Sequence, residues 1–224
     1  MKRIKLTLAI LGAAALCSAE TSAERLGQAT SVLSDIMDAP DGGVPHELME
    51  KAQCVVIIPG LKKGAFIFGG KYGRGYITCR AASGRGWSAP AGVTVEGGSF
   101  GFQIGGEEVD ALMLVMSKSG ATKLLQSKFT LGGDASVAAG PVGRTTAAAT
   151  DLQMHAEILT YSRTRGVFAG LSLGGATMRP DKQSNQELYH SSRSNQQIVF
   201  GKTVPPPAAA QLRENLSKYS MHKE

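Results

Sequence analysis

The chain has 224 residues, 24 of them basic and 18 acidic, for a net charge of +6, and it holds 28 glycines, nearly double ordinary usage. This length provides one substantial domain, and a mild charge without an arginine-rich tract or a block of like charges argues against nucleic-acid binding. The glycines follow no fixed period and lie inside apolar segments, which excludes collagen and a disordered linker.

The first 23 residues have the pattern of a secretory signal peptide. Lys2, Arg3 and Lys5 precede an uncharged, mostly apolar run over residues 6–16, and small residues follow it. A helix needs roughly 20 apolar residues to span a bilayer, so this run is too short to be an anchor. The sequence therefore predicts an exported protein, periplasmic or secreted.

Cleavage is expected after Ala19 or after Ala23. Removal of residues 1–19 leaves 21 basic and 18 acidic residues, a net charge of about +3. Acylation of Cys17, as in a lipoprotein, is the second choice, because Leu16 occupies the position where such signals have a small residue. The location of the mature protein is thus predicted to be outside the cytoplasm in either case.

An amphipathic helix is predicted next, over residues 26–37, where apolar side chains recur at helical spacing until Pro40 ends the pattern. Its apolar face has two open interpretations, packing on the protein's own core or contact with a membrane. The residues that would face a membrane are Leu26, Val32, Leu33 and Ile36. A second, short helix is predicted over residues 45–52, with proline in its first turn.

Short β-branched and apolar runs separated by glycine or proline begin at Cys54 and favour antiparallel strands. The expected strands cover residues 54–58, 65–68, 72–80, 91–96 and 99–105. A continuous apolar run at 111–116 predicts a strand buried on both faces, and 121–128 is typical of a short helix.

The last third of the chain alternates between β-like and polar segments. Residues 152–159 and 167–178 are expected to be paired strands, and 181–194 a short helix and loop. The C-terminal tail, residues 196–224, contains three consecutive prolines before a predicted helix over 208–219. The fold class predicted is α+β: one domain with a largely antiparallel, curved or barrel-like sheet and flanking helices.

Two cysteines, Cys54 and Cys79, remain once the signal peptide is removed. An even pair in an exported chain indicates one disulfide, closing a loop of about 25 residues. The alternative is two buried free thiols.

The sequence gives little support for an enzymatic function. The serine-hydrolase pattern G-x-S-x-G occurs twice, around Ser99 and Ser172, but a nucleophile elbow needs a strand before the serine and a helix after it. Both serines are followed by β-like, glycine-punctuated sequence, so a serine hydrolase is a remote alternative. The four histidines have no partners at ligand spacing, and no metal or cofactor is predicted.

Four basic residues lie close together in sequence around glycine-rich segments that are expected to be β-turns: Lys62, Lys63, Lys71 and Arg74. Each basic group near an anionic leaflet contributes about 1 kcal/mol, so these side chains are candidates for binding a lipid headgroup. The alternative is an ordinary solvated turn.

Five motifs occur in one order: GGKYGRG at 69–75, WSAP at 87–90, GFQIG at 101–105, GGDASVAAGPVGR at 132–144, and YSR at 161–163 ahead of GVFAG at 166–170. This order resembles the SYLF domain, over about Arg25 to Tyr189. The resemblance implies a lipid-binding module without enzymatic activity, here residues 24–195. Eukaryotic members are associated with phosphoinositide membranes, and yeast relatives with actin filaments.

Export makes actin an unlikely partner, so the expected partner is anionic phospholipid or a membrane surface of the cell envelope. The alternative is a structural or protein-interaction module of the envelope, with Trp87, Pro90 and the sheet edges making contacts with a protein partner.

Overall fold

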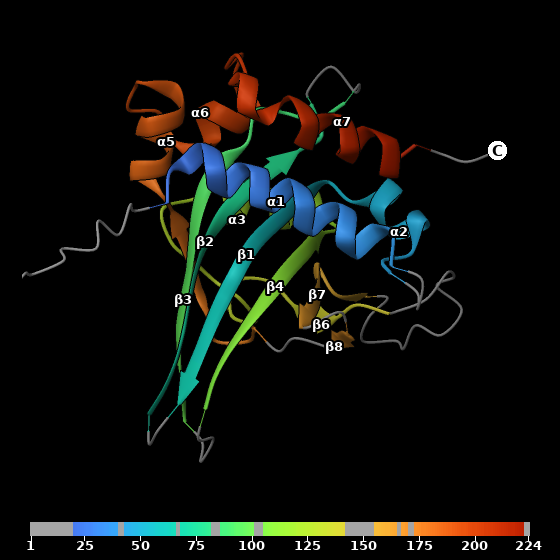
Figure 1. Cartoon of the computed structure of the whole chain (residues 1–224), viewed down its shortest axis with the longest axis vertical. Helices are drawn as coiled ribbons and strands as arrows, with labels where there is room; N and C mark the ends of the chain where they lie inside the picture. Colours follow the sequence, from blue (N-terminus) through green and yellow to red (C-terminus); the bar gives the residue numbers. More distant parts are fainter. Residues whose placement is uncertain are drawn as a thin grey trace, which may run out of the picture.

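The protein is a curved sheet with helices on both faces (Figure 1). The computed structural model describes residues 20–39, 43–65, 68–81, 86–100, 105–141, 155–164, 167–169 and 173–221. Most of the predicted signal peptide, including Cys17 and Ala19, lies outside these residues.

Nine strands of the described chain form one sheet, in the order β5-β9-β3-β2-β1-β4-β7-β6, with β8 paired to β7. Every pair is antiparallel except β6 with β7, so the predicted α+β class and largely antiparallel curved sheet are confirmed. The strands are β1 (Cys54–Ala65), β2 (Phe68–Cys79), β3 (Ala91–Phe100), β4 (Gly105–Val115), β5 (Phe129–Thr130), β6 (Val137–Ala139), β7 (Ile158–Thr164), β8 (Val167–Ala169) and β9 (Thr177–Pro180).

Two hydrophobic clusters lie on opposite faces of the sheet, because successive strand residues point to opposite sides. One face is covered by α1 (Ser22–Met37), α2 (His46–Lys51) and α7 (Ala210–Tyr219). The other packs against α3 (Lys118–Leu124), α6 (Asn195–Phe200) and β5. A further helix, α5 (Lys182–Tyr189), contacts β3 and α1.

The amphipathic helix α1 begins where its sequence supplies a capping box. The side chain of Thr21 accepts a hydrogen bond from the backbone N–H of Glu24, and the Glu24 carboxylate accepts one from the backbone of Thr21. Its apolar face packs on the sheet and α7: Leu26, Leu33 and Ile36 are fully buried and Val32 is 6% exposed. Of the two interpretations of this apolar face, the structure therefore shows packing on the protein's own core. These four side chains are not available for contact with a membrane.

Glycine-rich segments that the sequence analysis assigned to turns are parts of strands. Gly69 and Gly70 lie within β2 and pair with the end of β1, while Gly97 lies within β3. The expected strand end at Pro59-Gly60 is also wrong, since β1 continues through it with a shift in register. Gly60 has φ +55°, a backbone conformation that favours glycine, and this bulge lets the strand continue.

Glycine inside β2 permits close packing on the α3 side of the sheet. A Cβ added at Gly75 would lie against the backbone of Ile57, and one at Gly73 would meet the side chains of Ile58 and Leu61. Two glycines at alternate positions therefore face the same core cluster and let neighbouring strands approach.

Element boundaries differ from expectation at two further places. The helix expected over residues 121–128 begins earlier, since Ser117 caps α3 by accepting a hydrogen bond from the backbone N–H of Gly120. Residues 152–154 lie outside the described chain, and the strand of this region, β7, begins at Ile158.

The described part of the C-terminal tail is docked on the domain. A 3₁₀ turn (Pro207–Ala209) leads from the prolines into α7, which packs along α1. Leu212, Leu216 and Tyr219 recur at helical spacing on α7 and are buried. Residues up to Ser220 thus belong to the same folded unit as the sheet.

Among the described helices, none combines the length and the apolar content required to cross a membrane.

Candidate functional site

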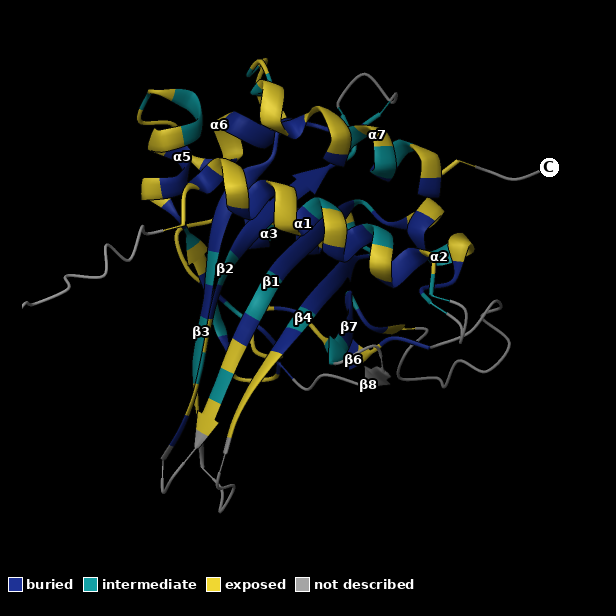
Figure 2. Cartoon of the chain, in the orientation of Figure 1, coloured by how far each residue is buried: buried dark blue, intermediate teal, exposed yellow. Residues whose placement is uncertain are grey.

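The central strands β1 to β4 extend beyond the helices at one end, where their residues become exposed (Figures 1 and 2). We call this part the sheet end, defined by described residues 62–64, 70–72, 96–98 and 106–108. Three of the four predicted headgroup residues, Lys62, Lys63 and Lys71, lie there. The strand pairing brings the two segments together across the β1–β2 hairpin.

Strand register divides these lysines between the two faces of the sheet. Lys63 is directly opposite Lys71 on β2 and Glu107 on β4, and these three point to the face of α3. Lys62 is opposite Tyr72 and Glu108 and points to the other face. The predicted four-residue cluster is therefore not a single patch.

Lys63 and Lys71 form the closest basic pair of the sheet end. Like charges directly opposite each other on neighbouring strands are unfavourable. Partial burial lowers the pKa of Lys71, and the charge of Lys63 lowers it further. The Glu107 carboxylate lies 3.7 Å from the Lys63 ammonium and is about half exposed, so it offsets only part of this repulsion.

Arg74, the fourth predicted residue, is engaged within the protein. Its guanidinium donates to both carboxylate oxygens of Asp181, at 2.6 and 3.0 Å, and to the hydroxyl of Ser184 on α5. Burial would raise the pKa of Asp181, but hydrogen bonds from Arg74 and Ser184 outweigh it and hold that pKa below its usual value. Arg74 thus anchors α5 to β2.

A hollow of about 470 Å³ lies beside the sheet end and includes residues that sequence analysis missed. Tyr72, half exposed, lines it together with Arg179 of β9 and Lys182 of α5. Arg179 forms an ion pair with Glu96 of β3. These basic residues are more than 100 positions from Tyr72, so no local motif could have pointed to them.

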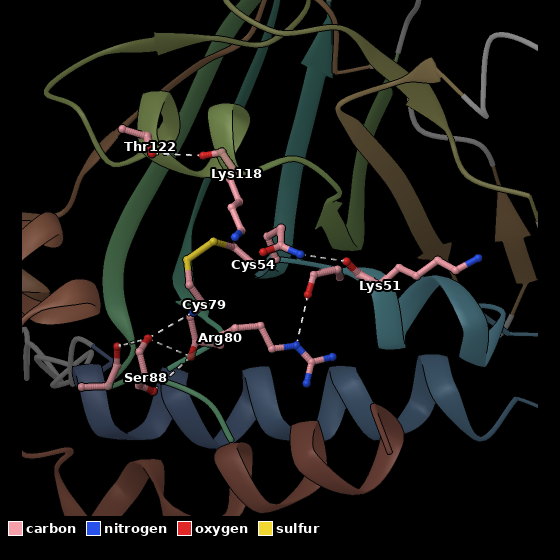
Figure 3. The surroundings of a disulfide bond; sticks show 11 residues. Lys51, Cys54, Cys79, Arg80, Ser88, Lys118 and Thr122 are labelled. Atoms are coloured by element: carbon pink, nitrogen blue, oxygen red, sulfur yellow. Dashed lines mark hydrogen bonds between the residues drawn. A yellow bond between two sulfur atoms is a disulfide. The ribbon is translucent and has the colours of Figure 1, made fainter. Parts of the chain in front are cut away.

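Cys54 and Cys79 are directly opposite each other on β1 and β2, and their sulfur atoms lie at bonding distance (Figure 3). Both are buried at the end of β1 remote from the sheet end. With a rise of roughly 3.3 Å per residue, Cys54 and Lys63 are about 30 Å apart along the strand. The two cysteines that were expected to form a disulfide are thus placed close enough to form one.

A second cavity of about 470 Å³ lies beside these cysteines, lined also by Lys118, Ala121 and Phe200. Phe200, one of the residues that line this cavity, is 42% exposed. Because this cavity lies at the opposite end of β1 from Lys63, it is not continuous with the basic sheet end. A single lipid headgroup at the sheet end would not place its acyl chains here.

Trp87 and Pro90, the residues proposed for protein contacts, are buried. The Trp87 indole donates a hydrogen bond to Ser220, and the Arg80 guanidinium lies 4.5 Å from its ring centroid. Arg80 also donates to the backbone carbonyl of Glu50. These residues therefore hold α2 and the C-terminal segment to the sheet, and a partner would have to contact other surfaces.

The two serines of the hydrolase pattern lie at the border of the described residues. Ser99 is within β3, and the next described element is the strand β4, so the strand-then-helix order of a nucleophile elbow is not found there. Ser172 lies outside the described residues, and the next described element after it is the strand β9. In the described ranges, no three His, Cys, Asp or Glu side chains gather as metal ligands.

Comparison with known proteins identifies the family. Residues 96–219 match the Ysc84 family model, described as Las17-binding protein actin regulator. The chain is 32% identical to human SH3 domain-containing YSC84-like protein 1 over 204 residues, 90% of this chain and 58% of that protein. It is also 32% identical to LAS seventeen-binding protein 3 of Saccharomyces cerevisiae over 175 residues, 77% of this chain and 38% of that protein.

The match to an SH3 domain-containing protein of Schizosaccharomyces pombe is 35% identical over 75% of this chain and 40% of the relative. The chain therefore spans about half the length of these relatives, or less. The matched residues run from the second half of β3 to the end of α7, whereas β1, β2 and the first half of β3 lie before the first matched position. Since more than half of the chain matches this model, the chain belongs to the Ysc84 family, the family of the SYLF domain.

Proposed function

We propose that this chain is a non-enzymatic binding protein of the cell envelope that docks on anionic phospholipid through its sheet end. The observation that carries the proposal is the direct pairing of Lys63 and Lys71 on strands that extend beyond the helices. A projecting element can reach a membrane surface without displacing α1 or α7 from the core. Lys62, on the opposite face of the same strands, adds a third positive charge.

Charge balance at the sheet end favours a surface-bound rather than a deeply enclosed anion. The three lysines of the sheet end are balanced by Glu96, Glu107 and Glu108, and an excess of positive charge remains only on the face where Lys63 and Lys71 lie beside Glu107. Binding should therefore be moderate and strongly weakened by salt, since exposed charges are screened over about 10 Å at 0.1 M ionic strength.

Co-sedimentation with vesicles tests this proposal. The protein should sediment with vesicles rich in anionic phospholipid at low salt, and much less with zwitterionic vesicles. Three lysines near an anionic leaflet contribute about 3 kcal/mol, so replacing Lys62, Lys63 and Lys71 by Gln should weaken binding by about 100-fold. Arg74 is left intact because its loss would disturb the fold.

A matched control removes three exposed lysines elsewhere. Lys51, Lys118 and Lys202 are exposed, and the first two lie near the disulfide end of the sheet (Figure 3). Replacing these three by Gln changes the net charge equally and should leave vesicle binding nearly unchanged. Equal losses in both triple variants would mean that overall charge, not the sheet end, governs binding, and no binding of the wild-type protein to anionic vesicles would refute the proposal.

A protein partner is the second candidate, because the family model is described as a Las17-binding actin regulator and the yeast relative is named for binding LAS seventeen. For this chain the proposed export argues against actin. Incubation with filamentous actin should show no co-sedimentation, whereas an envelope protein recovered with the wild-type chain but not with the Lys62, Lys63 and Lys71 variant would place the partner at the sheet end.

A further inference from the structure

Two candidate processing sites, after Ala19 and after Ala23, flank the first turn of α1. Both have a small residue at the cleavage position, so the sequence pattern alone does not choose between them. They differ in what they leave behind, because cleavage after Ala23 would remove residues 20–23. The contacts of those residues in the folded protein therefore bear on which site is used.

Thr21 and Glu24 form the capping box of α1. The Glu24 carboxylate accepts hydrogen bonds from the backbone N–H and the hydroxyl of Thr21, each at 2.8 Å. These hydrogen bonds hold the pKa of Glu24 below its ordinary value. A chain that starts at Glu24 has no Thr21, so the first turn loses its cap and Glu24 loses the partner that orients it.

Ser22 joins α1 to two other parts of the fold. Its backbone carbonyl accepts a hydrogen bond from the hydroxyl of Tyr76 at 2.6 Å, and its own hydroxyl donates to Glu187 on α5 at 2.5 Å. Ser22 and Tyr76 are 2% and 1% exposed. Loss of Ser22 would leave a buried tyrosine hydroxyl without this acceptor, which is unfavourable.

Glu20 holds the buried guanidinium of Arg25. The Arg25 Nε lies 2.9 Å from the Glu20 carboxylate, and Arg25 is 6% exposed. The Arg25 guanidinium also donates a hydrogen bond to the hydroxyl of Ser184 on α5, at 3.3 Å. Without Glu20, this buried positive charge would lose its carboxylate.

We infer that the signal peptide is removed after Ala19, so that the mature protein begins at Glu20 and keeps the complete first turn of α1. The inference rests on the export that is part of the proposed function. Residues 20–22 are parts of the fold: they cap α1, accept from a buried tyrosine and neutralise a buried arginine. The bond after Ala23 lies inside α1, so cleavage there would remove the start of the helix together with its cap.

Intact mass and N-terminal sequencing of the full 224-residue chain, expressed in an exporting bacterial host, test the inference. The expected first residue is Glu20. A first residue of Glu24 would overturn the inference and leave export standing, whereas an intact Met1 would overturn export itself. An acylated Cys17 as first residue would overturn the inference in favour of a lipoprotein.

Two substitutions distinguish cleavage after Ala19 from cleavage after Ala23. Ala19→Leu places a large residue at the proposed cleavage position and should prevent processing at Glu20. Ala23→Leu makes the same change at the alternative position; Ala23 is exposed in α1, so the fold should tolerate it and Glu20 should remain the first residue. Loss of Glu20 processing in the Ala23 variant alone would contradict the inference.

A stability measurement tests the physical reason separately. Proteins prepared directly to begin at Glu20 and at Glu24 should differ in melting temperature, the shorter one being lower by roughly 3 °C or more. Equal melting temperatures would show that residues 20–23 are dispensable for the fold and would remove the basis of the inference.

Discussion

Asp181 offers the sharpest test of how the helices are held to the sheet. It is 6% exposed, accepts two hydrogen bonds from Arg74, and caps α5 by accepting from the backbone N–H of Ser184 at 3.0 Å. Loss of a helix cap costs about 1 kcal/mol. Loss of the charge-assisted pair costs about 2 kcal/mol, near the lower part of its range because the Arg74 side chain is 23% exposed.

Asp181→Ala should therefore lower the free energy of unfolding by about 3 kcal/mol, which for a chain of this size is a fall in melting temperature of about 6–12 °C. Thermal unfolding followed by circular dichroism at pH 7 measures it. Asp181→Asn keeps a capping oxygen and should lose about half as much. Glu214→Ala, at an exposed position of α7, is the matched control and should melt within about 1 °C of wild type.

The pH dependence follows from the sign of the pKa shift. The pKa of Asp181 is lower in the folded protein than its unfolded value of about 3.9, so its stabilising contribution is fully present above that pH. The contribution is lost as the pH falls through the folded pKa, and the wild-type protein should approach the stability of Asp181→Asn. A melting temperature of Asp181→Ala equal to wild type at pH 7, or a constant difference between wild type and Asp181→Asn down to pH 2, would refute this reasoning.

Three further predictions concern the core, the disulfide and the lysine pair. Leu33→Ala should lower stability by about 3 kcal/mol in urea denaturation, while the exposed Gln28→Ala on the same helix should have little effect; similar small effects would argue against core packing of α1. Thiol titration of the denatured exported protein should find Cys54 and Cys79 unreactive until a reductant is added, and reduction should lower the free energy of unfolding by about 3 kcal/mol; two reactive thiols without reductant would show that no disulfide forms. Because its pKa is lowered, Lys71 should lose its charge at a lower pH than an ordinary lysine, so vesicle binding should weaken as the pH rises toward 10; Lys71→Arg should retain binding there, and an identical pH profile would contradict this role.

Local patterns were sufficient for the elements with strong periodicity. The apolar spacing of residues 26–37 predicted α1, and the apolar run at 111–116 predicted the buried part of β4. The glycines of β1 and β2 led to a wrong prediction of turns. Glycine also occurs inside strands where neighbouring strands pack closely, as at Gly75. Those strands are longer than expected and pass through the segments that were assigned to turns.

Local sequence patterns were not sufficient to define the candidate site, because it depends on strand register and on contacts between residues far apart in the sequence. Lys62, Lys63 and Lys71 were identified by proximity in sequence, but strand register decides that only Lys63 and Lys71 face each other. Arg74 looked equivalent to them, yet its partner Asp181 is 107 positions away. A short-range motif can therefore indicate a basic region. Only the folded structure shows which of its side chains are available for binding and which form ion pairs within the protein.

Hydrogen–deuterium exchange of the wild-type protein with and without anionic vesicles tests the central claim most directly, because it locates the membrane contact. The account predicts slower exchange in peptides that contain Lys63, Lys71 and Glu107, and unchanged exchange in α1 and α7, whose apolar faces are already packed. Slower exchange confined to α1 and α7, with no change at the sheet end, would contradict it.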